Sequence, residues 1–291
     1  GWDSKKHEKK MTGEVYVEPK LDGVRVITIC DVDKDEVKMF SRNGKELSNF
    51  PKILEQFDSM LDQMAESMVF DGEVMSDDFQ TLMREIHRKG GAKTDDAVLN
   101  LFDCIPLWAF KEGGYSASLQ TRKEMMDEYE FGPNISKVEF VRMNLDEDDG
   151  QKQFADYNKL CIDKGFEGIM VKPMSGPYEC KRSSLWLKVK PFIEVSLKVI
   201  DVEEGTGRNI GKLGALIVEG NDMDKFIKTN VGSGLTDSDR ESFWQAKDKL
   251  IGQIVEIRAD AITQNQDSKD EWSLRFPRFL RFRGFEIGEK L

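Results

Sequence analysis

Charged residues crowd the start of a hydrophobic, strand-like run near the beginning of the sequence, in the segment EPKLDGVR (18–25). Lys20, Asp22 and Arg25 stand there beside Gly23. Charged groups rarely lie at the boundary of a core unless they are paired or take part in chemistry. A lysine acts as a nucleophile only after it loses its proton, and neighbouring cations favour that loss. The segment therefore predicts a reactive lysine at the edge of a strand.

Further fragments share this arrangement of ionisable residues at strand ends. They read SRNG (41–44), FDGE (70–73), EG (167–168) and LKVK (187–190). In the last fragment, alternation along a strand places Lys188 and Lys190 on one face, where two ammonium groups favour a bound phosphate. These two lysines and Arg25 are candidates to promote the loss of the Lys20 proton.

Two carboxylates in these fragments, Glu73 and Glu167, are the candidate metal ligands. Mg²⁺ prefers oxygen ligands and commonly shares them with substrate phosphate. Each fragment alone is a weak signal, because K-x-D-G is commonly a turn and D-G-E commonly a hairpin. Four cysteines without a C-x-x-C pair and only two histidines argue against a zinc site or a Ser-His triad.

Taken in order, the fragments resemble the motifs of the ATP-dependent DNA ligases, a family of covalent nucleotidyltransferases. The compact bacteriophage-type enzymes are the most similar form. The match runs from about residue 14 to about residue 286. It comprises the segments 18–25, 41–44, 70–73, 101–103 (LFD), 166–172 (FEGIMVK) and 187–190.

This resemblance implies a reaction in three steps. Lys20 would attack the α-phosphate of ATP, forming a lysyl–AMP phosphoramidate and releasing pyrophosphate. AMP would then pass to the 5′-phosphate at a nick in duplex DNA, and the neighbouring 3′-hydroxyl would seal the strand. The implied cofactors are ATP and Mg²⁺, the implied partner is nicked double-stranded DNA, and the implied roles are replication, repair and recombination.

The resemblance also implies roles for the residues around Lys20. Glu18 would contact adenine, Phe102 would stack on its face, and Arg25 and Glu73 would contact the ribose. Plain core packing is the alternative for Phe102.

Other residues of the resemblance would hold phosphate, metal or DNA. Glu167 would bind the metal or the sugar. The expected phosphate-binding residues are Arg182, Lys188 and Lys190, and Arg42 would contact the nucleotide or the DNA. A solvated surface charge is the alternative for Arg182, and for Lys172 a site role and a structural role both stay open.

The last basic segment departs from the pattern of many relatives, in which an Asp-Lys pair follows the arginines. Here the sequence continues from Arg281 and Arg283 to Gly-Phe-Glu. Strand alternation places the two arginines on one face. They are expected to face the pyrophosphate of ATP, with a grip on the DNA backbone as the alternative.

The elements that must position these residues follow from hydrophobic periodicity. Helices are predicted over 48–68, 76–88, 118–130 and 150–164. Strand, tight turn and strand are predicted over 13–32, with Gly23 in the turn, and further strands over 68–74, 98–107, 167–172 and 185–190. From residue 195 onward five short strands (195–202, 214–218, 226–231, 253–259 and one near 272–283) and one helix (236–250) suit a small Greek-key barrel.

The predicted fold is therefore α+β, a nucleotidyltransferase (adenylation) domain over 1–192 followed by a C-terminal OB-fold β-barrel over 193–291. Few residues precede the first motif, so the sequence as it stands predicts no separate N-terminal DNA-binding domain. For the same reason NAD is disfavoured as the cofactor.

The net charge and the cysteine content limit which partners and which cellular compartment are expected. A net charge of −11 argues against nonspecific coating of nucleic acid, whereas basic clusters at 172–191 and 272–284 could grip a polyanion locally. No apolar run is long enough to span a membrane. The scattered cysteines favour reduced thiols in the cytoplasm of a bacterial cell or a phage-infected host. A monomer is expected.

Two rival functions remain open at this point. One is an RNA ligase or a GTP-dependent mRNA capping enzyme of the same superfamily. The other is a noncatalytic single-strand-binding OB protein, suggested by Phe276, Phe279 and Phe282 among the arginines. The second leaves the nucleotide motifs unexplained and predicts no covalent AMP adduct.

Overall fold

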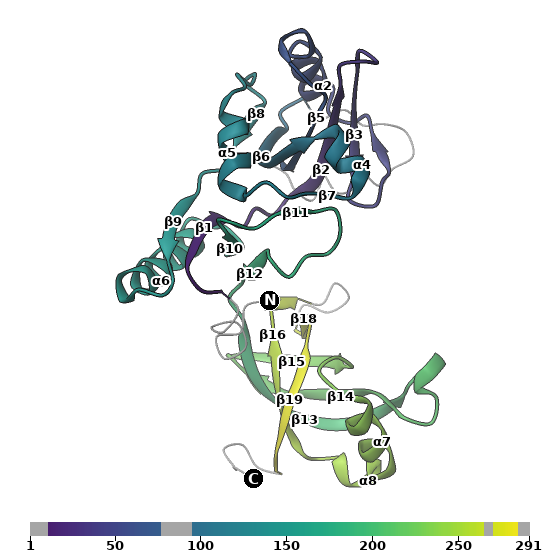
Figure 1. Cartoon of the computed structure of the whole chain (residues 1–291). Coiled ribbons are helices and arrows are strands. Elements are labelled where there is room, and N and C mark those ends of the chain that lie inside the picture. Colours follow the sequence, from purple (N-terminus) through teal and green to yellow (C-terminus); the bar gives the residue numbers. More distant parts are fainter. Residues whose placement is uncertain (1–10, 77–94, 265–269, 285–291) are drawn as a thin grey trace. The chain divides into compact units, whose positions relative to one another are not determined.

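The computed structural model describes residues 11–76, 95–264 and 270–284, and the chain divides into two compact units, Gly1–Lys190 and Pro191–Leu291. Figure 1 colours the chain from its N-terminus to its C-terminus. The helix predicted over 76–88 lies outside the described residues, apart from residue 76.

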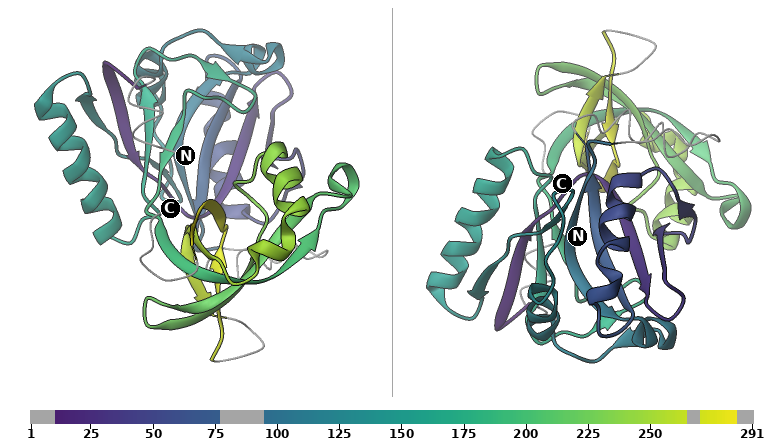
Figure 2. Two further views of the ribbon diagram at one scale, coloured as in Figure 1. Left: turned by 90° about the horizontal axis from the view of Figure 1, so that it is seen from below. Right: turned by 90° about the horizontal axis from the view of Figure 1, so that it is seen from above.

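The first unit contains a four-stranded antiparallel sheet that carries the candidate nucleophile. Its strands, in the order β12, β10, β1 and β9, are Leu187–Val189, Ile169–Pro173, Glu14–Pro19 and Val141–Asn144. Helix α6 (Asp148–Asp163) packs beside this sheet, as Figures 1 and 2 show. Phe154, Tyr157 and Cys161 of α6 join the apolar cluster formed by Val15, Val17 and the other inward residues of the strands.

A six-stranded sheet forms the rest of this unit, together with the short pair β7 (Gly114–Tyr115) and β11 (Tyr178–Glu179). Its order is β4 (Glu46–Leu47), β3 (Glu36–Ser41), β2 (Val24–Asp31), β5 (Met68–Met75), β6 (Val98–Pro106) and β8 (Ile135–Lys137). Only the pair β6–β8 is parallel among these described strands. Helices α2 (Pro51–Asp58), α4 (Leu107–Glu112) and α5 (Leu119–Asp127) are further described elements of this unit.

The helix predicted over 48–68 is wrong in its length. Helix α2 ends at Asp58, a 3₁₀ turn follows at Leu61–Gln63, and β5 begins at Met68. The Ser59 hydroxyl donates to the Glu55 carbonyl at 2.8 Å, and the Met60 N–H donates to Phe57 three residues back at 3.0 Å. These bonds tighten the last turn, so the apolar residues after it reach the core through a turn.

The strand, turn and strand predicted over 13–32 are present, but β1 and β2 belong to different sheets. Gly23 lies where they separate, and its φ is not in the left-handed region. Instead, a Cβ at Gly23 would lie 2.2 Å from the Val74 carbonyl oxygen. Close approach to β5, rather than turn geometry, therefore requires glycine here.

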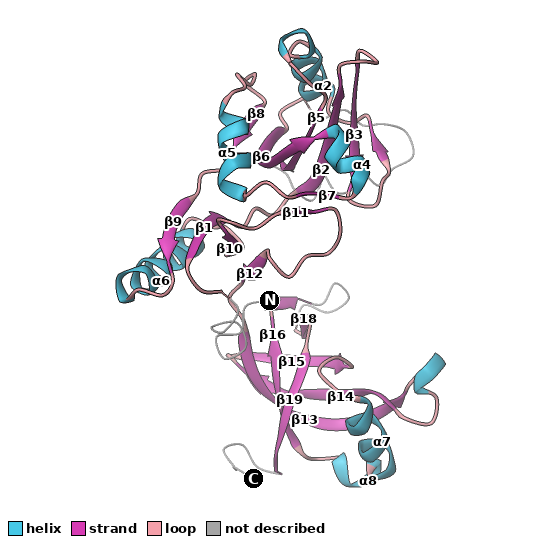
Figure 3. Ribbon diagram, viewed as in Figure 1, coloured by secondary structure: helices cyan, strands magenta, loops and turns pink. Residues whose placement is uncertain are grey.

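The second unit is dominated by strands, as the colouring of Figure 3 shows. Its sheet runs β17 (Ala261–Gln264), β18 (Trp272–Arg275), β15 (Lys225–Val231), β14 (Leu213–Asp222), β13 (Ile193–Glu204), β16 (Ile254–Ala259) and β19 (Arg278–Gly284). The Phe279 N–H donates to the Ser233 carbonyl at 2.8 Å, so the chain after β15 meets the edge strand β19. This bond links the two outer members of the five-strand set β15-β14-β13-β16-β19.

Two predicted elements of this unit are divided in the structure. The strand near 272–283 is two strands, β18 and β19, because Phe276 turns the chain with a φ of 51° before Pro277. The helix over 236–250 is α7 (Asp237–Gln245) followed by α8 (Lys247–Leu250). Thr236 and Asp239 form a reciprocal capping box at the start of α7.

Candidate active site

Lys20 lies directly after β1, against the chain that leads into β10. The Lys20 N–H donates to the Gly168 carbonyl at 2.9 Å, and the Glu167 N–H donates to the Lys20 carbonyl at 3.2 Å. The Lys20 ammonium forms an ion pair with Glu167, and the Lys190 ammonium lies 3.2 Å from the same carboxylate. Pairing of β1 with β10 therefore brings three residues together that are far apart in the sequence.

Glycine makes this close approach possible at residue 168. Gly168 has a φ of 140°, and a Cβ there would lie 2.0 Å from the Val189 carbonyl oxygen. The glycine thus allows β12, which leads to Lys190, to pass next to Glu167. The E-G pair at 167–168 has a structural reason as well as a chemical one.

Glu167 is held as a carboxylate between two cations. Burial alone would raise the pKa of Glu167, but the hydrogen bonds and charges of Lys20 and Lys190 outweigh it and lower that pKa. The side chain retains 16% exposure, so it remains open to a ligand.

Glu73 is a second carboxylate near Lys20, and its surroundings act in the opposite direction. Burial raises the pKa of Glu73 to about 7, although the Gly23 N–H and the charges of Lys20 and Arg25 act to lower it. The Gly23 N–H donates to Glu73 Oε1 at 3.2 Å. Glu73 is therefore a partly buried acid that forms no ion pair with any other described residue, and a nearby cation would favour its ionised form.

Arg25 is fixed by a fork of hydrogen bonds to Asp71. Its Nε and Nη2 atoms lie 3.0 Å and 2.6 Å from the two carboxylate oxygens, and the Tyr178 hydroxyl donates to Asp71 at 2.7 Å. The guanidinium lies 5.8 Å from the ring centroid of Phe102 and 5.6 Å from that of Trp186. Strand pairing of β2 with β5 sets this geometry, with Arg25 opposite Glu73.

Phe102 and Trp186 form an aromatic pair with their rings edge to face and 5.7 Å apart. The Lys172 ammonium lies 4.4 Å and 4.2 Å from the two ring centroids and donates to Glu18 at 2.6 Å. Lys172 is 1% exposed. Sequence reasoning missed Trp186; the signal available was an aromatic residue directly before the LKVK segment.

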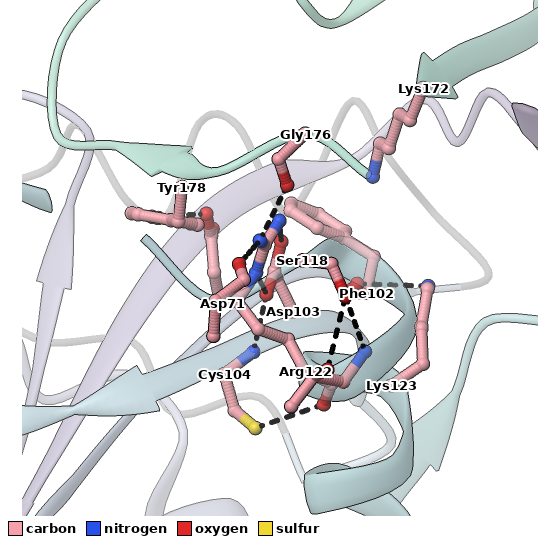
Figure 4. A network of polar contacts seen from close by, with 12 residues as sticks. Asp71, Phe102, Asp103, Cys104, Ser118, Arg122, Lys123, Lys172, Gly176 and Tyr178 are labelled. Atoms are coloured by element: carbon pink, nitrogen blue, oxygen red, sulfur yellow. Dashed lines mark hydrogen bonds and ion pairs between the residues drawn. The ribbon is translucent and has the colours of Figure 1, made fainter. Parts of the chain in front are cut away.

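Lys123 is a second residue that sequence reasoning missed. Its ammonium donates to Glu18 and, at 2.9 Å, to the Phe102 carbonyl. Figure 4 shows this contact, with Lys123 on α5 and Lys172 on β10. Lys123 lies in the charged segment TRKE (121–124) of a predicted helix, and such a segment is typical of a solvent-exposed helix face.

An ion pair behind the site is fully enclosed. Arg122 Nε and Nη2 donate to the two oxygens of Asp103 at 2.8 Å and 3.0 Å, and both side chains are 0% exposed. Further Arg122 donors reach the Ala117 and Gly176 carbonyls. This network (Figure 4) ties β6 to α5 and to the loop before β11.

Three of the predicted phosphate- or DNA-binding residues are exposed in the first unit. Arg42 lies in the turn after β3, Arg182 lies after β11, and Lys188 lies on β12. Such positions leave the charged groups accessible to a polyanion.

The two predicted arginines of the second unit share one partner. Arg281 Nε lies 3.2 Å from Glu256 Oε2, and Arg283 Nε donates to the same oxygen at 2.6 Å. Both side chains therefore lie on one face of β19. Glu256 is 7% exposed.

The donor set near Lys20 suits Mg²⁺ rather than a metal that needs an all-protein cage. No group of three His, Cys, Asp or Glu residues that could hold a metal occurs among the described residues. Glu73 and Glu167 supply two carboxylates, and Mg²⁺ is commonly bound by one or two carboxylates plus substrate phosphate. Across the described part of the chain, no helix is both long and apolar enough to cross a membrane.

The sequence is similar to known protein families and to proteins of known name. Residues 3–190 match the model of the ATP dependent DNA ligase domain, and residues 204–283 match that of the DNA ligase OB-like domain. The DNA ligase of Haloarcula marismortui is 31% identical over 294 residues, which cover 92% of this chain and 51% of that protein.

Two solved structures share the fold. One named Pmar-Lig_Pre is 47% identical, has a TM-score of 0.87, and is matched over 98% of this chain and 66% of its own. The ATP-dependent DNA ligase of bacteriophage T7, solved with ATP, has a TM-score of 0.51 over 96% of this chain and 95% of its own. At 18% identity, the second likeness shows the fold alone.

These matches confirm the predicted fold class, an α+β adenylation domain with a C-terminal OB-like domain. The chain spans about half the length of the curated relatives it matches. Because one family model covers most of the first unit and another covers most of the second, the chain belongs to the ATP-dependent DNA ligase family.

Proposed function

We propose that this chain is the catalytic core of an ATP-dependent DNA ligase that seals nicks in duplex DNA through a lysyl–AMP intermediate on Lys20. The observation that carries the proposal is the convergence on Lys20 of Glu167, Lys190 and Glu73 within a domain of this family. The proposed domains are the adenylation domain over 1–192 and the OB domain over 193–291.

The nucleotide would be held by residues that the fold gathers around Lys20. Glu18 and Phe102 would receive the base, and Arg25 and Glu73 would contact the ribose. Asp71 fixes the Arg25 guanidinium before any ligand arrives, so little side-chain entropy would be lost on binding.

The phosphates would be held by the exposed and half-buried cations of the first unit. These are Arg42, Arg182, Lys188 and Lys190. Glu73 and Glu167 would hold Mg²⁺, which when bound would neutralise phosphate charge. Arg281 and Arg283 of the second unit would bind the pyrophosphate group, with the DNA backbone as the other candidate ligand.

The chemistry assigned to Lys20 balances in three displacements. The Lys20 ammonium loses a proton, its Nζ forms a bond to the α-phosphorus, and the bond to pyrophosphate breaks. An oxygen of the DNA 5′-phosphate then attacks the same phosphorus, and the N–P bond breaks. Finally the 3′-hydroxyl loses its proton and attacks the 5′-phosphorus, and AMP leaves.

The protein is proposed to act as a monomer in a reducing compartment, the cytoplasm. The described cysteines Cys30, Cys104, Cys161 and Cys180 are all free thiols, which fits such a compartment.

Labelled ATP tests the proposal directly. The wild type, incubated with ATP and Mg²⁺, should form one acid-labile AMP adduct that peptide mass spectrometry locates at Lys20, and should then seal nicked DNA. Lys20→Ala should abolish the adduct without loss of thermal stability, whereas Lys111→Ala, on the exposed face of α4, should retain it. Full-level adduct on Lys20→Ala would refute the assignment.

The same assay separates the rival enzymes. A panel of ATP, GTP and NAD, each offered with nicked DNA and nicked RNA, should give adduct and sealing with ATP and nicked DNA. Preference for GTP or for RNA would favour the capping-enzyme or RNA-ligase alternative.

A further inference from the structure

Glu18 is a buried carboxylate whose two oxygens are each taken by a different lysine. The side chain is 2% exposed. The Lys123 ammonium donates to Oε1, and the Lys172 ammonium donates to Oε2 at 2.6 Å. Because an ionised carboxylate carries no proton, it can only accept hydrogen bonds from any further partner.

The two lysines differ in what else they touch. The Lys172 ammonium lies against the aromatic pair of Phe102 and Trp186. The Lys123 ammonium lies 4.9 Å from the ring of Phe140 and borders a separate groove of about 450 Å³. Lys123 therefore lies over the ring of Phe140, whereas Lys172 lies over the rings of the aromatic pair.

Lys123 also joins the two sheets of the first unit. Glu18 is on β1 of the four-stranded sheet, and the Phe102 carbonyl, 2.9 Å from the Lys123 ammonium, is on β6 of the six-stranded sheet. One side chain thus fixes the acceptor Glu18 relative to the strand that carries Phe102. Lys123 is 3% exposed, so water competes little for these bonds.

The charges around Glu18 favour its ionised form. Burial alone would raise the pKa of Glu18, but Lys172 and Lys123 outweigh it and hold that pKa below its usual range. The charged and titratable groups that act on this cluster from the packed elements are Lys172 of β10, Lys123 of α5, Asp103 of β6 with its partner Arg122, and Tyr157 of α6.

Resting on the proposed adenylation activity, we propose that Lys123 is a positioning residue that sets nucleobase selectivity by keeping Glu18 an ionised acceptor beside Phe102. An adenine base offers an amino group at C6, which donates to such an acceptor. A 6-oxo purine presents an oxygen there, and two acceptors facing each other repel. A buried polar group left unpaired in this way is a strong source of discrimination.

Adduct formation with ATP and ITP tests the proposal, because hypoxanthine differs from adenine only at C6 and in the proton on N1. The wild type should prefer ATP by about 100-fold or more in kcat/KM. Lys123→Met and Lys123→Gln should lower that preference by about tenfold, with the effect falling on KM more than on kcat. Lys123→Arg keeps the charge and should restore the preference.

The pH profile separates a charge effect from a merely structural one. The ATP/ITP ratio cancels the titration of the triphosphate, which both nucleotides share. It should stay flat from about pH 5.5 to about pH 8 in the wild type, because the lowered pKa keeps Glu18 ionised throughout. In Lys123→Gln, Glu18 has lost one cation and takes up a proton at higher pH, so the ratio should fall as the pH is lowered.

Lys137→Met is the matched control, because Lys137 lines the same groove and pairs with Asp127 instead of Glu18. It should leave the ATP/ITP ratio unchanged at every pH. Thermal unfolding of each variant shows whether it is folded. If Lys123→Met does not fold, the ATP/ITP ratios of Lys123→Gln and Lys123→Arg test the proposal.

A folded Lys123→Gln with the full, pH-independent preference would overturn the proposal. A wild-type ATP/ITP ratio that decreases as the pH is lowered from about 8 to about 5.5 would also overturn it, and this measurement needs no variant. Failure of the wild type to form any AMP adduct would instead refute the proposed function.

Discussion

At the scale of single residues, the site contains carboxylates whose surroundings set different charge states. Glu18 and Glu167 each receive two lysine ammonium groups, and the pKa of each is lowered despite burial. Burial dominates at Glu73, where the pKa is raised to about 7. Glu18 and Glu167 therefore stay ionised through the neutral range, whereas Glu73 exchanges its proton near pH 7.

The raised pKa of Glu73 predicts a pH-dependent stability. A carboxyl with a pKa of about 7 in the folded state and about 4.3 in the unfolded state binds its proton more tightly when folded. Its contribution is therefore present at low pH and is lost as the pH rises to about 7. The free energy of unfolding of the wild type should fall relative to Glu73→Gln by about 3 kcal/mol between about pH 4.5 and about pH 7.5.

Urea unfolding at the two pH values measures this difference. Glu55→Gln, at an exposed position of α2, controls for the substitution itself. A difference between the wild type and Glu73→Gln that does not change with pH would contradict the assignment.

The enclosed pair of Arg122 and Asp103 predicts a large loss of stability when it is broken. Arg122→Met would leave the Asp103 carboxylate buried without its charged partner, at a cost of about 3–5 kcal/mol. Lys137→Met breaks the exposed pair with Asp127 and should cost at most about 1 kcal/mol. Denaturant midpoints compare the two, and similar losses would show that the buried pair is not a structural anchor.

At the scale of elements, the site depends on two positions at which the backbone of a neighbouring strand passes unusually close to the chain. Residue 23 lies where β1 and β2 diverge into separate sheets, and residue 168 lies where β12 passes Glu167. Backbone of another strand fills the space in which a side chain would begin at both positions. The glycines of the first and fourth motifs are therefore part of how Lys20, the proposed nucleophile, is positioned.

Alanine substitutions distinguish close approach from backbone conformation. Gly23→Ala places a Cβ 2.2 Å from the Val74 carbonyl oxygen, so β2 or β5 must shift, and a loss of about 3 kcal/mol is expected. In Gly44→Ala the added Cβ has no atom within 4 Å. Its only cost is the left-handed backbone conformation, with a φ of 79°, and a loss of about 1 kcal/mol in stability is expected. Thermal unfolding compares the two, and equal losses would contradict the steric account.

At the scale of the whole molecule, the second unit is expected to take part in only some steps of the reaction. ATP carries a pyrophosphate leaving group that requires positive charge, and none remains once AMP is on the enzyme or the DNA. Arg281 and Arg283 share the carboxylate of Glu256 on one face of β19. This arrangement keeps two guanidinium groups together where a polyanion could replace Glu256.

Replacing both arginines with alanine should slow self-adenylation by about 100-fold and should slow sealing of a pre-adenylated nick much less. Glu256→Gln is included in the variant and tested alone as the control, because the double substitution would otherwise leave a buried carboxylate unpaired. Equal losses in both assays would favour a grip on the DNA backbone, and a loss confined to sealing would contradict the prediction.

Much of the fold could be predicted from the sequence, whereas the assignment of the nucleophile stays a prediction. Motif order singled out Lys20, Glu73 and Glu167, which the structure places near one another. Period-2 and period-3.6 patterns located β5, β6, α5 and α6 close to their observed bounds. These features are encoded locally, because strand alternation, helical spacing and glycine beside a charged residue need only neighbouring residues.

Only the tertiary structure decided which residues lie together around Lys20 and Glu18, and how their surroundings shift each pKa. Lys123 and Trp186 became part of the site because α5 and the chain before β12 approach β1 and β6, and no local pattern sets that approach. The end of α2 at Asp58 depended in the same way on the turn that follows it. Burial, which acts through every neighbour at once, raised the pKa of Glu73 while paired lysines lowered that of Glu18; the sequence presents both simply as glutamates.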